Sequence, residues 1–303
     1  MTNYQDPETV LTVNNVPVRL LHTETLKSNG KVYIVLDDSD VIPVVTINAP
    51  RSVVDALEAD NVVATADFYN ITEDYKVPIA LTTNKYSDSI THISGSVNEV
   101  SLSIEDEKTA TLTITPGVTG QVGEGYQIGQ ITMDQNQVRV TGPASEVNNV
   151  ASAGVTVDMT DAENSINTYA EIHLYDKDGR DIEIDKNLSL NIDKVMVRVE
   201  VLAVKEIPVK IALSGTPAEG YRLTGETSVE PGRINIAGKK SALEAVDSVS
   251  IPSTELSVSG LSKDLVKNVD ITKYLPDDVS LASGQDKTVK VTVEITEKET
   301  EEE

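Results

Sequence analysis

The strongest constraint on this chain is a unit of about 95 residues that is written three times in succession. Its closing phrase is the easiest part to align, because VSLSIE begins at residue 100, VMVRVE at 195 and VKVTVE at 289. Each phrase alternates apolar and polar residues, as a β-strand with one buried face requires. A fixed period of this length predicts similar folding units in tandem, and it allows function to reside in the array or between units instead of in one pocket.

Two further landmarks recur at the same period. Gly30, Gly125 and Gly220 each have a Tyr nearby, which predicts a shared tight turn because glycine accepts positive φ. Further on, a Ser follows each strand and precedes apolar residues at i and i+3, so we expect it to be the N-cap of a short helix whose apolar pair faces the core. These serines are Ser52, Ser145 and Ser241, and the pairs are Val54 with Leu57, Val147 with Val150, and Leu243 with Val246.

Strands and turns fill the rest of each unit. The strand after the helix ends at Asp67 in the first unit and Asp158 in the second, whereas Pro252 occupies that region of the third. The exit strand VMVRVE continues directly into VLAVKEIPVKIAL (201–213), and a junction this short restricts hinge motion. We therefore predict a mainly β fold: an elongated tandem array of three similar β domains, each with one short helix. The domains are residues 9–105, 106–200 and 201–296, followed by an acidic tail (297–303) that is too charged to pack.

Composition excludes several classes of function. The chain has no Cys, which removes disulfides, thiolate catalysis and Cys-ligated zinc. Its 25 basic and 49 acidic residues give a net charge of −24, which repels nucleic acid and anionic lipid. This charge favours solubility, with calcium sites or steering toward a basic partner as the alternative. The sequence shows no transmembrane segment or signal peptide, and its polar opening MTNYQDPETV suggests that a preceding segment has been removed.

Motifs for catalysis or metal binding are weak. His22, His92 and His173 occupy unrelated places in their units, and no pair has the spacing of metal ligands. YDKDGRDIEID (175–185) resembles the start of a calcium loop, but Arg180 and Asn187 stand where ligands belong, so a D-G hairpin is favoured.

Two other segments resemble binding loops only superficially. GVTGQVGEG (117–125) lacks the Lys-Ser/Thr of a phosphate loop and is interpreted as a loop between strands, and LDDSD (36–40) as a solvated turn. We expect no catalytic, cofactor-binding or metal-binding residues and no enzymatic activity, and we assign no partner-binding residues.

The order of these landmarks resembles that of YbbR-like domains. The phrases that carry the resemblance are VRVTGPASEVNNVASAGVTVDM (138–159), YDKDGRDI (175–182) and VMVRVEVLAVKEIPVKI (195–211). The second unit matches best, while the first and third lack the D-G hairpin and the third also lacks the Asp. Together the matches cover nearly the whole chain, although each motif is short.

The resemblance implies a role as well as a fold. Such proteins typically have one N-terminal transmembrane helix, followed by three or four of these domains outside the cytoplasm. In many Gram-positive bacteria they regulate the membrane-bound diadenylate cyclase and hence cyclic di-AMP. We therefore expect the non-catalytic, extracytoplasmic part of a membrane-anchored cyclase regulator, monomeric as this fragment, touching the membrane only through an N-terminal anchor that is missing here. The alternatives are a structural or adhesive β-repeat rod of the cell surface and a calcium-binding or hydrolytic extracellular protein.

Overall fold

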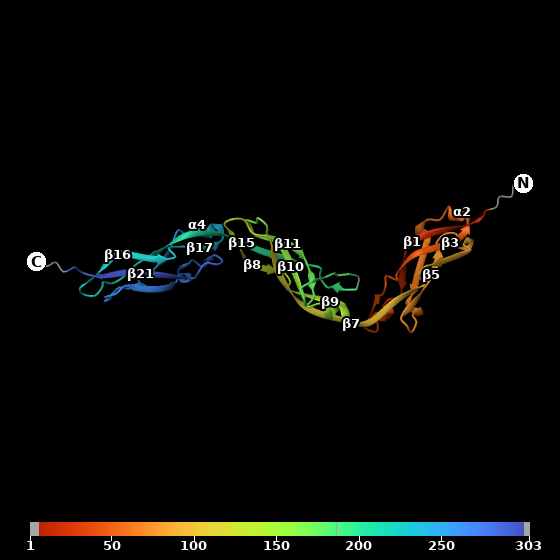
Figure 1. The fold of residues 1–303 in the computed structure, drawn as a ribbon, viewed down its shortest axis with the longest axis horizontal. Coiled ribbons are helices and arrows are strands. Elements are labelled where there is room, and N and C mark those ends of the chain that lie inside the picture. The colour runs from red at the N-terminus through yellow and green to blue at the C-terminus, as the bar shows by residue number, and fades with distance from the viewer. Residues whose placement is uncertain (1–5, 186, 300–303) are drawn as a thin grey trace. The chain divides into compact units, whose positions relative to one another are not determined.

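The computed structural model describes residues 6–185 and 187–299 (Figure 1). The chain divides into two compact units. The first unit extends to Ile114 and includes Gln137–Gly154 and His173–Asp193; the second consists of Thr115–Asn136, Val155–Ile172 and the chain from Lys194 onward. The division therefore passes through the second predicted repeat, because the strands at Glu99–Thr119 and Ser152–Asp158 each carry the chain from one unit into the other.

The first repeat is a β structure around its own core. β1 pairs antiparallel with β3 and parallel with β4, which pairs with β5 (Figure 1). Alternation along β1 and β4 buries Val16, Val18 and Ala64, and Phe68 closes this core. Its elements are β1 (Glu8–Leu21), α1 (Glu24–Lys27), β2 (Lys31–Val35), β3 (Val41–Pro50), α2 (Arg51–Val54), β4 (Val62–Asp67), β5 (Lys76–Thr83) and β6 (His92–Gly95), with 3-10 turns at Ala59–Asn61, Phe68–Asn70 and Ser87–Ser89.

The junction between the first two repeats is a single strand. β7 (Glu99–Thr119) is 21 residues long and crosses the predicted boundary after residue 105 without a turn. Its residues 102–106 pair with β2, and residues 107–113 pair with β9. β15 (Lys194–Ile211), with 18 residues, crosses the next boundary in the same way. The prediction that exit strands continue into the following unit is confirmed.

The second repeat contributes elements to both compact units. In the first unit lie β9 (Gln137–Pro143), α3 (Ala144–Asn149), β12 (His173–Tyr175), β13 (Asp181–Ile182) and β14 (Ser189–Leu190). In the second unit lie β8 (Tyr126–Met133) and β11 (Ile166–Glu171), both paired antiparallel with β15. β10 (Ser152–Asp158) begins in the first unit and ends in the second.

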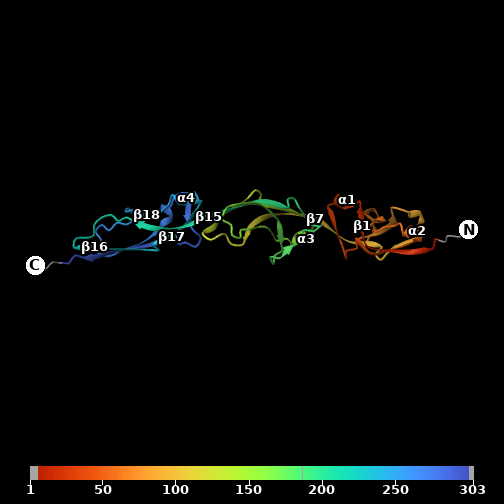
Figure 2. The same cartoon turned by 90° about the horizontal axis from the view of Figure 1, so that it is seen from above.

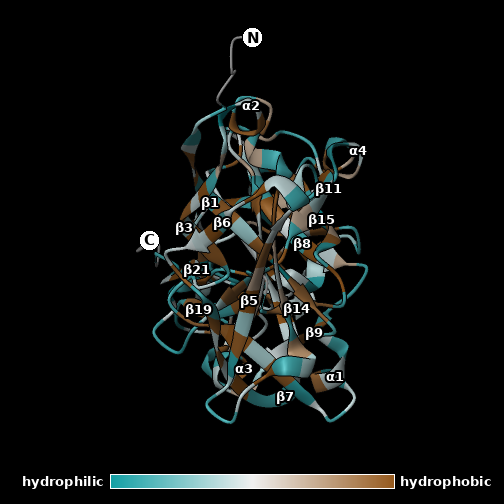
Figure 3. Cartoon of the chain, turned by 90° about the vertical axis from the view of Figure 1, so that its right-hand side faces the viewer, coloured by the Kyte–Doolittle hydropathy of each residue, from teal (hydrophilic) through white to brown (hydrophobic). Residues whose placement is uncertain are grey.

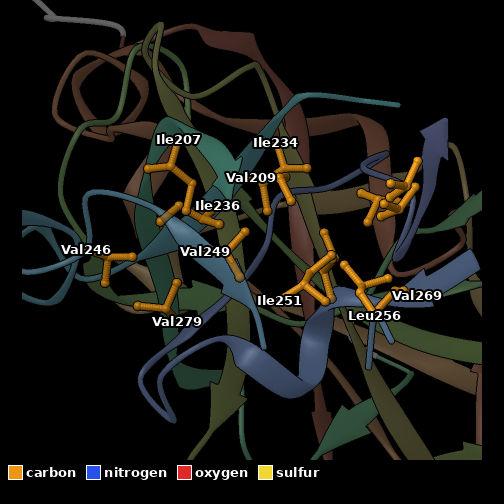
Figure 4. Packing of buried hydrophobic residues seen from close by; sticks show 14 of the residues in the cluster. Ile207, Val209, Ile234, Ile236, Val246, Val249, Ile251, Leu256, Val269 and Val279 are labelled. Carbon is orange, nitrogen blue, oxygen red and sulfur yellow. The ribbon is translucent and has the colours of Figure 1, made fainter. Parts of the chain in front are cut away.

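The third repeat has its own core in the second unit. Ile207, Ile236 and Ile251 come from three different strands and are buried together (Figure 4). α4 lies beside β17 (Figure 2) and contributes Leu243 to this core. The hydrophobic segments gather in strands, while many connecting loops are hydrophilic (Figure 3). Its elements are β16 (Tyr221–Glu230), β17 (Arg233–Gly238), α4 (Lys240–Glu244), β18 (Val249–Ile251), β19 (Leu265–Asp270), a 3-10 turn (Ile271–Tyr274), β20 (Val279–Leu281) and β21 (Thr288–Glu297).

Several landmarks are confirmed. Gly30, Gly125 and Gly220 have φ values of +67°, +81° and +85°, as the shared turn requires. β4 and β10 end at Asp67 and Asp158. Each carboxylate then accepts the backbone N–H two residues further on, at 3.0 Å in the first case and 2.9 Å in the second, so the Asp terminates the strand by starting a turn.

The predicted N-caps are wrong by two residues. The caps of α2, α3 and α4 are Pro50, Pro143 and Lys239, and the serines lie inside the first turn without capping it. In α3 the cap is supplied from another strand, because both Glu105 carboxylate oxygens accept bonds of 2.8 Å from the Ser145 N–H and hydroxyl. Asp6 bonds Ser52 in the same way. In both helices a carboxylate about forty residues or more earlier in the chain thus satisfies donors that a local cap would otherwise take.

Other expectations need smaller corrections. The first repeat has a second α-helix, α1, in addition to the one short helix that was predicted. Glu297 belongs to β21 and the Lys298 N–H donates to the Gly220 carbonyl, so the tail begins later than predicted; residues 300–303 lie outside the described part of the chain.

Candidate functional site

His22 and His173 form surface contacts, while His92 lies exposed at the start of β6. His22 Nδ1 lies 2.8 Å from Asp67 Oδ1, and its ring stacks on Tyr69 with centroids 4.4 Å apart. The Tyr69 N–H and then His22 lower the pKa of Asp67. His173 lies 3.6 Å from Asp181 on the exposed side of β12. Within residues 6–185 and 187–299, no three His, Cys, Asp or Glu side chains are grouped so that they could hold a metal ion.

The segment that resembled a calcium loop is a hairpin. β12 and β13 pair antiparallel, and Gly179 has φ +77° in the turn between them. Asp176 Oδ1 accepts the N–H groups of Asp178 at 2.8 Å and Arg180 at 2.9 Å. These backbone donors lower the pKa of the Asp176 carboxyl, with the Arg180 N–H contributing most. The Asp176 carboxylate therefore accepts hydrogen bonds within the turn and stabilises it. The predicted hairpin is confirmed.

The glycine-rich segment at 117–125 is only partly a loop. β7 continues to Thr119, so the predicted loop is wrong for residues 117–119 and correct from Gly120. The acidic segment 36–40 is a turn that leads into β3, as predicted.

The candidate site lies in the first compact unit. It is a pocket of about 300 Å³ lined by segments from the first two repeats, and every lining residue belongs to that unit. One wall comes from β2, with Lys31, Val32 and Tyr33; a second comes from β9, with Thr141, Gly142 and Pro143. Further lining comes from Val35 at the end of β2, from Asp40 in the turn before β3, and from β1, the ends of α1, β7 and the β14 region, which contribute Leu20, Thr23, Lys27, Glu107, Asn187 and Ser189.

One strand positions both walls. Lys31 is paired with Asp106 and Pro143 with Glu107, so consecutive residues of β7 hold the start of β2 and the end of β9. Lys31 Nζ also donates to Asp106 Oδ1 at 2.6 Å, which raises the pKa of the Lys31 ammonium. Because ladder bonds fix both segments to the same strand, the pocket is preformed by backbone pairing.

Close approach shapes the second wall. A Cβ on Gly142 would lie 2.7 Å from the Asn187 carbonyl oxygen and 2.9 Å from Leu188 Cδ2, so only glycine lets the β14 segment lie this near. The Asn187 Nδ2 group donates to Glu146 at 3.1 Å and to Asp185 at 3.2 Å. Burial, and then the charge of Asp185, raise the pKa of Glu146.

Sequence reasoning missed this pocket. Its walls are separated by more than a hundred residues, and no single segment carries a recognisable binding motif. The one available signal was the uninterrupted exit strand. It indicates that two repeats share a strand, but it does not indicate which side chains line a pocket beside that strand.

The fold defines a mainly β protein in which a similar unit recurs along the chain. The model of the YbbR-like protein family matches residues 111–201 and 207–293, more than half of the chain. The chain therefore belongs to the YbbR-like family, which confirms the resemblance. No helix in the described part of the chain is long and apolar enough to cross a membrane.

Three individual proteins show similarity to this chain. The CdaA regulatory protein CdaR of Bacillus subtilis (strain 168) is 24% identical over 285 residues, which cover 93% of this chain and 56% of that protein. The chain thus spans little more than half the length of this relative. A crystal structure of a YbbR-like protein from Streptococcus pneumoniae is 12% identical, with 67% of this chain and 100% of that one covered and a TM-score of 0.44. A solution structure from Streptococcus thermophilus is 24% identical, with 34% and 92% covered and a TM-score of 0.27.

Proposed function

We propose that this chain is the extracytoplasmic part of a membrane-anchored regulator of a diadenylate cyclase, and that it acts on cyclic di-AMP levels without catalysing a reaction. The observation that supports the proposal is its 24% identity, over 93% of its length, to a protein named as a regulator of CdaA. Its partner is the membrane-bound cyclase of a Gram-positive bacterium, and an N-terminal anchor outside this sequence provides the only membrane contact.

The surface chemistry is compatible with regulation by contact. A net charge of −24 disfavours nucleic acid and anionic lipid headgroups as direct partners, and leaves proteins and uncharged ligands. The three predicted repeats, 9–105, 106–200 and 201–296, would serve as the regulator's sensing part.

The test measures cyclic di-AMP in cells that express the cyclase with the full-length regulator, without it, or with a version that lacks the anchor. We expect the regulator to change the cyclic di-AMP level and to co-purify with the cyclase from detergent-solubilised membranes, and we expect both effects to depend on the anchor. Unchanged cyclic di-AMP together with no co-purification would refute the proposal, and a simultaneous loss of cell adhesion would favour the adhesive-rod alternative.

The non-catalytic part of the proposal needs its own measurement. Purified chain incubated with ATP and a divalent cation should form no cyclic di-AMP, while the cyclase domain in the same buffer does. Product formed by the chain alone would overturn this part and leave the interaction with the cyclase to be judged separately.

A further inference from the structure

The first-unit pocket differs from a packing defect because it offers polar groups that the fold does not use. Among residues 6–185 and 187–299, the side chains of Thr23, Lys27 and Glu107 make no hydrogen bond to protein. They come from two elements, because Thr23 and Lys27 lie at the two ends of α1 and Glu107 lies in β7. A hydroxyl, an ammonium and a carboxylate thus supply donors and acceptors on one lining.

Other polar groups of the pocket lining already form hydrogen bonds within the protein, which limits the groups that a ligand can bond. Asn187 Nδ2 donates to Glu146 and Asp185, so Asn187 offers its Oδ1 as an acceptor. The Ser189 hydroxyl donates to the Thr141 carbonyl at 3.2 Å and keeps its lone pairs for a second partner. Leu20, Val32 and Pro143 add apolar surface between these polar groups. The lining is therefore a mixture of apolar surface and separated polar groups, the usual character of a small-molecule site.

The charges of the lining select against ionic ligands. Lys27 and Lys31 are balanced by Asp40 and Glu107, and Lys31 is already paired with Asp106 at 2.6 Å. An anion would meet two carboxylates and the field of a chain with net charge −24, and a cation would meet two ammonium groups. A ligand without net charge that carries many hydroxyls can bond to the ammonium, carboxylate, amide and hydroxyl groups at once.

We propose that this pocket binds a small, uncharged, hydroxyl-rich molecule of the saccharide class. Its volume of about 300 Å³ lies at the small end of ligand sites, enough for one or two sugar rings. The apolar side chains would cover the C–H faces of a ring while Lys27, Glu107 and Asn187 bond its hydroxyls. The inference is independent of the proposed cyclase regulation, because it concerns binding by the isolated chain.

The experiment is a titration of the isotope-labelled chain, followed by amide chemical shifts. The probes are glucose and cellobiose, with a zwitterionic dipeptide, inorganic phosphate and spermidine as comparisons. At the binding energy typical of small ligands, we expect a Kd for a neutral saccharide on the order of 1 mM. The shifts should centre on Val32, Gly142 and Ser189.

Matched variants locate the site. Lys27→Ala and Glu107→Gln remove side-chain groups that no fold contact uses, and each should weaken saccharide binding about tenfold, a typical effect of losing a bond to a charged group. Lys85→Ala and Glu73→Gln make the same changes at exposed positions of the first repeat outside the pocket, and they should leave binding unchanged. Spectra of all four variants without ligand establish that they are folded.

Three results would overturn the proposal. The first is the absence of shifts with either saccharide, and the second is shifts that centre outside the pocket or persist undiminished in Lys27→Ala and Glu107→Gln. The third is stronger binding of the dipeptide, phosphate or spermidine than of the saccharides, which would assign the pocket a different ligand chemistry.

Discussion

The capping of α3 by Glu105 allows a sharp test, because the donor and acceptor lie in different elements. Both carboxylate oxygens accept bonds of 2.8 Å, one from the Ser145 N–H and one from its hydroxyl. Replacing a helix cap by Ala costs about 0.5–2 kcal/mol. A hydrogen bond to a charged group contributes about 1.5–3 kcal/mol, and less where water reaches it. We therefore expect Glu105→Ala to lower the local free energy of unfolding by about 1–2 kcal/mol.

The assay must report on α3 itself, since a chain with two compact units need not unfold in one step. Hydrogen exchange of the amides over Ala144–Asn149 provides this readout. A loss of about 1.4 kcal/mol corresponds to a tenfold fall in their protection if exchange follows local opening. Exchange in the third-repeat core around Ile236 should be unchanged, which gives an internal reference.

The end of the second repeat supplies a matched control. Glu200 ends VMVRVE as Glu105 ends VSLSIE, but its Oε2 lies 3.4 Å from the Gln130 N–H and caps no helix serine. Glu200→Ala should therefore change stability by less than about 0.5 kcal/mol. In a double-mutant cycle, Glu105→Ala and Ser145→Ala should be non-additive by about 1 kcal/mol. Equal effects of the two Glu substitutions, or full additivity in the cycle, would refute the reasoning.

Three further predictions follow from packing and burial. Burial raises the pKa of Glu146 above its ordinary 4.5, so the folded state binds this proton more tightly than the unfolded chain does. The ionised carboxylate therefore lowers the free energy of unfolding as pH rises above about 4.5, and it has no such effect well below that pH. In denaturant titrations, Glu146→Gln should therefore raise the free energy of unfolding more at pH 7 than at pH 4. Equal effects at the two pH values would contradict this. Gly142→Ala should destabilise the first unit by about 1–3 kcal/mol in the same titrations. Gly117→Ala should be tolerated, because the nearest atom to its added Cβ would be 3.6 Å away, an ordinary contact. Similar unfolding midpoints for the two variants would contradict the argument from close approach. Thermal and denaturant unfolding should show that Ile236→Ala, at a fully buried site, lowers stability by about 2–5 kcal/mol. Val266→Ala, at a site that is 58% exposed, should lower stability by less than about 0.5 kcal/mol. A comparable loss from both substitutions would show that burial does not determine the loss.

Much of the fold could be predicted because its signals are local. The φ values of Gly30, Gly125 and Gly220 follow from turn chemistry, and alternation identified the exit strands. The mainly β class and the family are confirmed by the structure and the family match. The domain boundaries and the elongated arrangement stay predictions.

The errors arose where remote partners decide the outcome. Ser145 has the sequence context of an N-cap, yet Glu105, forty residues earlier, bonds its hydroxyl and its N–H. The pocket could not be predicted for the same reason, since Lys27 and Asn187 meet only after β7 has paired with both β2 and β9. Periodicity indicates which face of a strand is buried, but it does not indicate which distant side chains share a cavity.

The uninterrupted course of β7 through residues 105 and 106 has a consequence for how such a chain can change in evolution. Successive residues of a strand point to opposite faces, so one residue inserted at this boundary would exchange the inward and outward positions of everything on one side of it. Leu102 and Ile114, both buried, could not then keep their places together. Two inserted residues would preserve the alternation. The spacing between these repeats is therefore constrained by parity, odd against even, and insertions in related chains should occur in pairs at this boundary while loop tips accept any number.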